Sequence, residues 1–257
     1  MSRLAAALPP RAREALLRAA RPVIGRLEAR RTRHLSDRER WERALGTEVG
    51  FWRTYLGDLA SEDKTNYRRP DYAWSEEPVC ARVADKLPMG RVDIVDVGAG
   101  PMTAVPKVHP GREIHITAFD PLADDYNARL DELGIEPLVR TRRSSGEDLL
   151  QHVGEGSFDL AHASNCLDHA YDPAAAIRNM VLAVKPGGLV LLRHARNEAV
   201  NEHYVGLHQW NFDAEDGDFI LWRPDLRRNL SRELADLADG EVFFEGPEIA
   251  WLLRRRL

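Results

Sequence analysis

Short apolar runs alternate with amphipathic segments through the middle of the chain, between about residues 91 and 193. Each apolar run has the length of a buried strand, and most of the intervening segments repeat their apolar positions at helical spacing. Such alternation predicts a parallel sheet with helices on both faces. The predicted strands are 92–97, 113–119, 137–140, 158–163 and 189–193, and the predicted helices are 103–108, 122–133, a short helix after Gly146, and 173–184.

The C-terminal part of the chain follows a different pattern. Residues 218–222 predict an extra strand, and residues 231–237 predict a helix. Two further apolar segments, 241–245 and 248–254, are separated by a Gly-Pro pair. We therefore expect these two segments to form an antiparallel pair that closes one edge of the sheet.

The first 72 residues predict a helical extension. Residues 1–34 hold nine Arg and two Glu, and their apolar positions predict an amphipathic helix that Pro22 breaks or bends. Two interpretations stay open for this basic segment: packing on the main domain, or peripheral contact with an anionic surface. Residues 37–60 predict a second helix, rich in aromatic side chains. We divide the chain into an extension over 1–72 and a main domain over 73–257.

A glycine turn after the first predicted strand indicates a ligand site. Asp96 interrupts the apolar run, and Gly98 and Gly100 lack a β-carbon, so a ligand can approach the backbone closely. Asp120 ends the next strand 22 residues after Gly98, where doubly wound folds place the acid that binds ribose. Met102 stands where a dinucleotide site would have further glycine, so the turn suits S-adenosylmethionine better than a pyrophosphate.

Five motifs in order make the chain resemble the class I S-adenosylmethionine-dependent methyltransferases over about residues 75–257. The resemblance implies an α/β fold with a doubly wound, mostly parallel, seven-stranded Rossmann-like sheet. It also implies that the N-terminal helices cover the cofactor as a lid, with Trp52 and Tyr55 either stacked on adenine or substrate or packed in the core. The motifs are Asp96-Val97-Gly98-Ala99-Gly100, Asp120, Gly146-Glu147-Asp148, Ser157 to Ala163 followed by Asn165-Cys166-Leu167-Asp168-His169, and Val184-Lys185-Pro186-Gly187-Gly188.

The same resemblance implies a set of cofactor contacts. Asp120 would accept hydrogen bonds from both ribose hydroxyls, because one carboxylate can accept two. Glu147 or Asp148 would accept from the adenine amine, although both also suit the first turn of a helix. The expected cofactor-binding residues are Asp96, Gly98, Ala99, Gly100, Asp120, Pro121, Glu147, Asp148 and Asn165.

Several histidines follow the predicted strands, where open α/β sheets form their binding crevice. Transfer of a methyl group to a hydroxyl needs a base, and histidine titrates near neutrality. Among the competing histidines, which include His203, we expect the catalytic residues to be His169, His208 and Asp168, and the acceptor-binding residues to be His194, Gln209, Trp210 and Asn211.

These residues predict O-methylation of a small molecule or a sugar or glycan by direct in-line transfer. The segment Leu207 to Phe212, Leu-His-Gln-Trp-Asn-Phe, also resembles a bacterial subgroup often associated with glycan or secondary-metabolite gene clusters. The alternatives are N- or C-methylation of a secondary metabolite and a non-catalytic, cofactor-binding accessory protein. An RNA methyltransferase is a further alternative, since the N-terminus is basic.

Composition narrows the remaining possibilities. The net charge of −5 argues against general nucleic-acid binding, and two scattered cysteines do not form a disulfide framework. No stretch of 18 apolar residues is present, so we expect a cytoplasmic protein. We expect no metal, because the strands before Ser164 and His194 do not end in the acids that metal-dependent O-methyltransferases of this fold use, and Asp168 comes several residues later.

Overall fold

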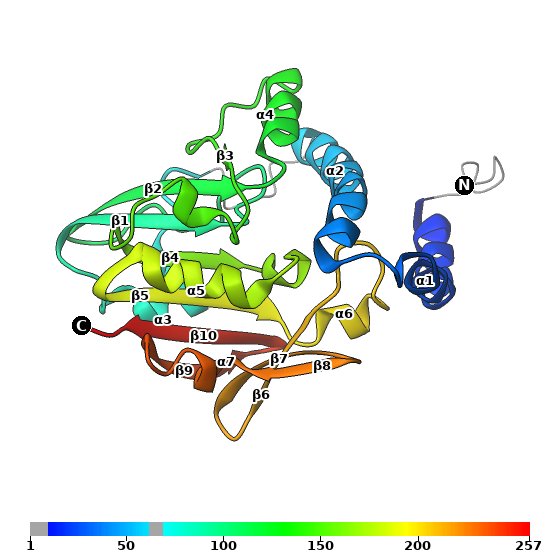
Figure 1. Ribbon diagram of the computed structural model, residues 1–257. Helices are drawn as coiled ribbons and strands as arrows, with labels where there is room; N and C mark the ends of the chain where they lie inside the picture. The colour runs from blue at the N-terminus through cyan, green and yellow to red at the C-terminus, as the bar shows by residue number, and fades with distance from the viewer. Residues whose placement is uncertain (1–9, 62–68) are drawn as a thin grey trace.

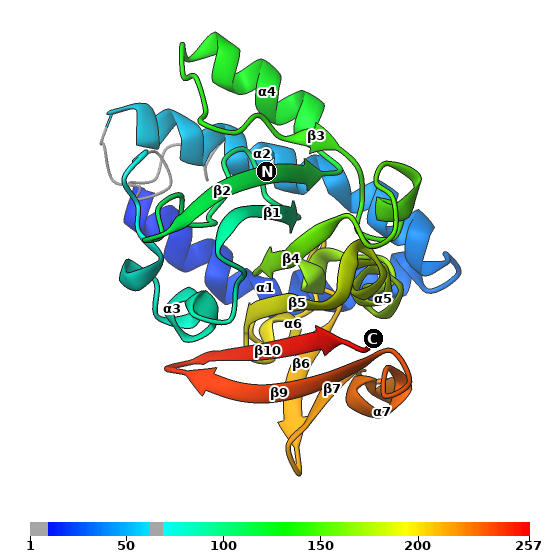
Figure 2. The same cartoon turned by 90° about the vertical axis from the view of Figure 1, so that its left-hand side faces the viewer.

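Seven strands form one sheet in the order β3-β2-β1-β4-β5-β10-β9 (Figures 1 and 2). The structure, a computed structural model, describes residues 10–61 and 69–257. Strands β1 to β5 run parallel, whereas β10 is antiparallel to both β5 and β9. This confirms the predicted doubly wound sheet and its closing pair. The strands are β1 Gly90–Val97, β2 Arg112–Asp120, β3 Arg142–Arg143, β4 Phe158–Ser164, β5 Val184–Ala195, β9 Ala238–Glu245 and β10 Glu248–Arg255.

Helices cover both faces of this sheet, and two long helices precede it (Figure 1). They are α1 Pro10–Thr32, α2 Asp37–Ser61, α3 Pro78–Ala84, α4 Ala123–Glu132, α5 Pro173–Ala183, α6 Glu198–Asn201 and α7 Leu230–Glu233, with 3₁₀ turns at Trp74–Glu76, Leu149–Gln151 and Leu167–His169.

The core lies on both faces of the sheet because the central strands are apolar at successive positions. Successive side chains of a strand point to opposite faces. Val95 and Val97 of β1 therefore join the cluster packed beneath α5, whereas Val92 and Ile94 join the cluster packed beneath α3. All four are buried. Such two-sided burial is why the parallel strands show continuous apolar runs in the sequence.

The N-terminal helices pack against the main domain. In α1, which continues through Pro22, Arg21 pairs with Glu202, and the carboxylate of Glu28 accepts a hydrogen bond from the backbone N–H of Gly206 at 3.0 Å. These contacts join the described part of α1 to the segment that follows α6. The helix α2 lies across the carboxyl ends of the parallel strands (Figure 1).

Two predicted elements differ in the structure. Residues 103–108 form a loop, because prolines at 101, 106 and 110 limit the backbone donors that a helix would need. The third strand is Arg142–Arg143 and not 137–140, where the side chain of Leu138 is exposed.

The chain also has a second sheet, of which the sequence predicted one strand. Its strands β6 (Asn211–Glu215), β7 (Asp218–Arg223) and β8 (Leu226–Asn229) form an antiparallel meander. Buried aromatic rings, Phe212 and Phe219, join this meander to the core, where Phe219 stacks on Trp251 of β10. The meander therefore anchors the segment that precedes it against the main sheet.

Candidate active site

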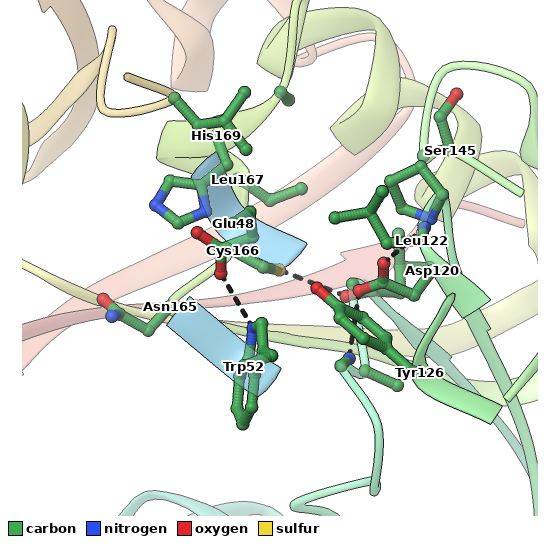
Figure 3. A pocket seen from close by; sticks show the side chains of 18 of the residues that line it. Glu48, Trp52, Asp120, Leu122, Tyr126, Ser145, Asn165, Cys166, Leu167 and His169 are labelled. Carbon is green, nitrogen blue, oxygen red and sulfur yellow. Dashed lines mark hydrogen bonds between the residues drawn. The ribbon is translucent and has the colours of Figure 1, made fainter. Parts of the chain in front are cut away.

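A cavity of about 380 Å³ opens at the carboxyl ends of β1, β2 and β4, beneath α2 (Figure 3). Its walls come from segments far apart in the sequence, as expected for the crevice of an open α/β sheet. They include the glycine turn after β1, the end of β2 and the turn after β4. Several predicted cofactor residues line the cavity: Gly98, Ala99, Gly100, Asp120, Pro121, Glu147 and Asn165.

The glycine turn leaves room at the floor of the cavity. Gly98 and Gly100 have φ angles of +69° and +63°, in the left-handed region that favours glycine. A β-carbon at Gly98 would lie 2.5 Å from the sulfur of Cys166, and one at Gly100 would lie 3.4 Å from the ring of Trp52. Both glycines are therefore required by conformation, and Gly98 also by space.

Asp96 lies beneath this turn and does not line the cavity. Its carboxylate accepts a hydrogen bond from the hydroxyl of Thr103 at 2.6 Å and lies 2.7 Å from Nδ1 of His162. Because all three side chains are buried, they fix the loop that follows β1 from below. The sequence analysis expected Asp96 to bind the cofactor, but the polar contacts of Asp96 in the structure are with Thr103 and His162 within the protein.

Asp120 holds the turn after β1 and the start of the segment after β2 together. Its two carboxylate oxygens accept hydrogen bonds from the backbone N–H groups of Gly100 at 3.0 Å and Leu122 at 2.9 Å. Burial raises the pKa of Asp120 to about 7, although the two hydrogen bonds oppose this shift. Each carboxylate oxygen retains lone pairs for a ligand.

The two neighbouring acids after β3 differ in position. Glu147 lines the cavity and accepts a hydrogen bond from the backbone N–H of Asp172 at 2.8 Å, and burial raises its pKa. Asp148 does not line the cavity, and its carboxylate accepts from Ser145 and Gln151 instead. The sequence left open which of these two acids faces the cofactor, and only Glu147 lies on the cavity wall.

Two cavity residues, Glu48 and Tyr126, were not predicted from the sequence. Glu48 comes from α2, and its carboxylate accepts a hydrogen bond from the indole N–H of Trp52 at 2.8 Å (Figure 3). Trp41, Glu48 and Trp52 are spaced by seven and four residues and all line the cavity, so this spacing was a signal available in the sequence. Tyr126, in the first turn of α4, contacts Trp52 edge to face.

Asp168, His169 and His208, which the sequence analysis named as catalytic candidates, meet at the edge of the cavity. Nδ1 of His208 lies 2.8 Å from the Asp168 carboxylate and 3.0 Å from Nε2 of His169, which lines the cavity (Figure 3). Burial raises the pKa of Asp168, but the two histidines outweigh it and lower that pKa to about 2. Burial lowers the pKa of His208, and the hydrogen bond and charge of Asp168 outweigh it and raise that pKa.

A sequence profile described as a methyltransferase domain matches residues 53–237, more than two thirds of the chain. The chain belongs to the methyltransferase-domain family. It is an S-adenosylmethionine-dependent methyltransferase of class I, and its strand order agrees with that fold. Its acceptor is a small molecule or a macromolecule.

Solved structures similar to this methyltransferase share little of its sequence. An S-adenosylmethionine-dependent methyltransferase from Mesorhizobium loti has 17% identity and a TM-score of 0.46, over 71% of this chain and 100% of its own. One from Clostridium acetobutylicum has 12% identity and a TM-score of 0.46, over 79% and 98%. The N-methyltransferase NodS from Bradyrhizobium japonicum has 15% identity and a TM-score of 0.45, over 72% and 97%. No curated protein matches the sequence.

The cavity of the methyltransferase fits this cofactor. When bound, S-adenosylmethionine supplies an electrophilic methyl group on a sulfonium centre. The glycine turn leaves space for a ligand against the backbone, and the carboxylates of Glu48, Asp120 and Glu147 suit a cation. None of the helices in the described residues is long and apolar enough to span a membrane.

Four residues expected to bind the acceptor do not line this cavity. His194 is fully buried, its ring packs at a tilt against Phe212, and neither ring nitrogen has a hydrogen-bond partner among the described residues. Burial lowers the pKa of His194 to about 3. The side chain of Gln209 donates to the carbonyl oxygens of Tyr204 and Gly206. The side chain of His194 therefore packs in the core, and that of Gln209 binds the backbone of the loop before it.

Trp210 and Asn211, the other two expected acceptor-binding residues, also use their polar groups within the protein. The indole N–H of Trp210 donates to the carbonyl oxygen of Ala170 at 2.9 Å, next to His169. The buried amide of Asn211 donates to the hydroxyl of Tyr204 and the carbonyl oxygen of Trp222. These side chains hold the segment around His208 rather than face the cavity, because each uses its polar group within the protein.

Proposed function

We propose that this methyltransferase O-methylates a small molecule or a sugar or glycan by direct in-line transfer. One observation carries the proposal: His169 lines the cavity and is linked through His208 to the buried carboxylate of Asp168. A hydroxyl acceptor must lose a proton during methyl transfer, and a histidine on the cavity wall is positioned to take it.

The proposed cofactor contacts are made by residues that line the cavity. Asp120 accepts from the ribose hydroxyls with the lone pairs that its two backbone contacts leave free, and Pro121 lies beside the ring. Glu147, and not Asp148, faces the adenine amine. The backbone of the glycine turn and Asn165 border the methionine part.

The three catalytic residues have different roles. His169 accepts the hydroxyl proton at its ring, and Asp168, whose Oδ2 lies 3.4 Å from Nε2 of His169, stabilises the resulting positive charge while also binding His208. A buried carboxylate does this well because the low local dielectric strengthens charge–charge interactions. Asp168 is 1% exposed, so water does not screen it.

The segment Leu207 to Phe212 supports this arrangement. The backbone N–H of Gln209 donates to the carbonyl oxygen of Asp168 at 3.2 Å, and the Trp210 indole donates to Ala170. Two hydrogen bonds thus tie the residues after His208 to both sides of His169. In this proposal, Gln209, Trp210, Asn211 and His194 position the catalytic residues and do not touch the acceptor.

A transfer assay with methyl-labelled cofactor tests the proposal. The acceptor panel pairs sugars and phenols with amino sugars and anilines of the same shape, and mass spectrometry locates the label. We expect label on oxygen in at least one hydroxylated acceptor and none on its amine counterpart. Label on nitrogen or carbon would contradict O-methylation, and cofactor binding without transfer to any acceptor would favour the accessory role.

A further inference from the structure

Three metal-ligand atoms converge at the edge of the methyltransferase cavity. Oδ2 of Asp168 lies 2.8 Å from Nδ1 of His208 and 3.4 Å from Nε2 of His169, and the two nitrogens lie 3.0 Å apart. Across residues 10–61 and 69–257, this is the one group of three His, Cys, Asp or Glu side chains with ligand atoms this close together.

Hydrogen bonds within this triangle require one N–H group to serve two acceptors. The Asp168 carboxylate only accepts, so one imidazole must supply a proton to it. If Nδ1 of His208 donates that proton, the lone pair of His169 Nε2 shares the same N–H with the carboxylate. If Nε2 of His169 is also protonated, two N–H groups face each other at 3.0 Å. A cation between the three atoms would satisfy all of them at once.

The triangle is slightly smaller than a zinc coordination shell. Zinc binds imidazole nitrogen and carboxylate oxygen at about 2.0–2.2 Å, which at tetrahedral angles places neighbouring ligand atoms about 3.3–3.6 Å apart. The observed sides are 2.8, 3.0 and 3.4 Å. Small side-chain movements therefore bring all three atoms to bonding distance of a single ion.

Two further features suit a cation. Oδ1 of Asp168 is buried and has no hydrogen-bond partner in the described part of the chain, so the carboxylate retains unused acceptor capacity beside the triangle. His169 lines the cavity, which gives an ion a route of entry and leaves open positions on that side. Three protein ligands with an open position are typical of reactive rather than purely structural zinc sites.

We propose that Asp168, His169 and His208 form a binding site for one divalent transition-metal ion. Two imidazoles and one carboxylate favour zinc, iron or cobalt over magnesium or calcium, which prefer oxygen ligands. Metal binding releases the proton that the three side chains share, because the ligands must be deprotonated. The ion and the acceptor proton thus compete for the lone pair of His169.

The sequence analysis expected no metal because it considered acids at the ends of the two strands before Ser164 and His194. The proposed site uses instead the 3₁₀ turn after β4 and a histidine 39 residues beyond it in the chain. Only the folded chain brings these ligands together, so the strand ends did not indicate the site.

Zinc titration of the metal-free full-length chain, in competition with a chromogenic chelator, tests the proposal. We expect one equivalent to bind to the wild type. The variants Asp168→Asn and His169→Gln should bind at least tenfold more weakly, since loss of even an outer-shell partner costs about 10–100-fold. His115→Gln is the matched control, because His115 lies in β2 and does not line the cavity. This variant should bind zinc as the wild type does. Cobalt should give visible absorption bands that both site variants lose.

Two results would overturn the proposal: no binding by the wild type, or equal binding by the wild type, His169→Gln and His115→Gln. Circular dichroism of each variant separates loss of the site from loss of the fold, and His169 is the informative position because it lies on the cavity wall. The titration does not depend on turnover. Absence of metal binding would therefore leave the proposed base role of His169 intact, whereas failure of O-methylation would leave the metal site intact.

Discussion

The cofactor side and the acceptor side of the cavity are built in different ways. The cofactor side uses the backbone: two glycines with positive φ, and two N–H groups that bind Asp120. The acceptor side uses side chains, with His169 and His208 arranged around Asp168. A backbone site depends on the fold and on a few glycines, whereas a side-chain site depends on each ionisable group. Substitutions should therefore affect cofactor affinity on the first side and turnover on the second.

Replacement of the proposed base is expected to have the largest effect. His169→Gln keeps the approximate size of the side chain but removes its ability to take a proton, so kcat should fall about 10²- to 10⁴-fold. The dissociation constant for S-adenosylmethionine should change little. Steady-state kinetics with an acceptor from the panel and calorimetry with the cofactor measure the two quantities. His115→Gln serves as the control, and equal losses in both variants would remove His169 from the mechanism.

Addition of a methyl group to the glycine turn should break the cofactor side. Gly98→Ala combines a left-handed backbone, worth about 1–2 kcal/mol, with overpacking against Cys166, worth about 1–3 kcal/mol. Gly134→Ala is the matched control, because the φ of Gly134 is +65° but none of the described residues lies within 4 Å of a β-carbon at this position. Urea denaturation should show a larger loss of unfolding free energy for Gly98→Ala. Equal losses in the two variants would show that space beside Cys166 is not limiting.

The pH dependence of cofactor affinity should show a titration that belongs to Asp120 on the cofactor side. Burial raises the pKa of Asp120 to about 7, so its carboxyl is mostly ionised at pH 8 and mostly neutral at pH 6. The ionised form is the better acceptor for ribose hydroxyls, so affinity should fall about tenfold as the pH falls across that interval. Asp120→Asn has no such titration and should lose this component. Parallel pH profiles for the wild type and Asp120→Asn would assign the titration to another group.

Sequence reasoning could find the elements of the cofactor side, because its signals are local. A buried strand, a glycine turn and an acid at the end of the next strand lie between residues 92 and 120, and the structure places Gly98, Gly100 and Asp120 on the wall of one cavity. Their contacts with the cofactor stay a prediction. The wrong helix over 103–108 arose because apolar spacing was weighed above the prolines that flank it.

The acceptor side could be predicted only in part. The position of Asp168 and His169 after β4 indicated the cavity, and the structure confirms that His169 lines it. The pairing of His208 with Asp168 spans 40 residues and depends on how the segment before β6 folds back. Trp210 and Asn211 were expected to face the acceptor, because a dense polar and aromatic segment does not reveal which side chains the protein uses for itself.

Calorimetric titration of S-adenosylmethionine into the wild type, Asp120→Ala and His169→Gln, under one set of conditions, tests the division between the two sides most directly. We expect Asp120→Ala to lose about 100-fold or more in affinity, because it removes two hydrogen bonds to a charged group worth about 1.5–3 kcal/mol each. His169→Gln should bind as the wild type does. Equal affinity in Asp120→Ala and the wild type, or a comparable loss in His169→Gln, would contradict the separation of cofactor binding from acceptor activation.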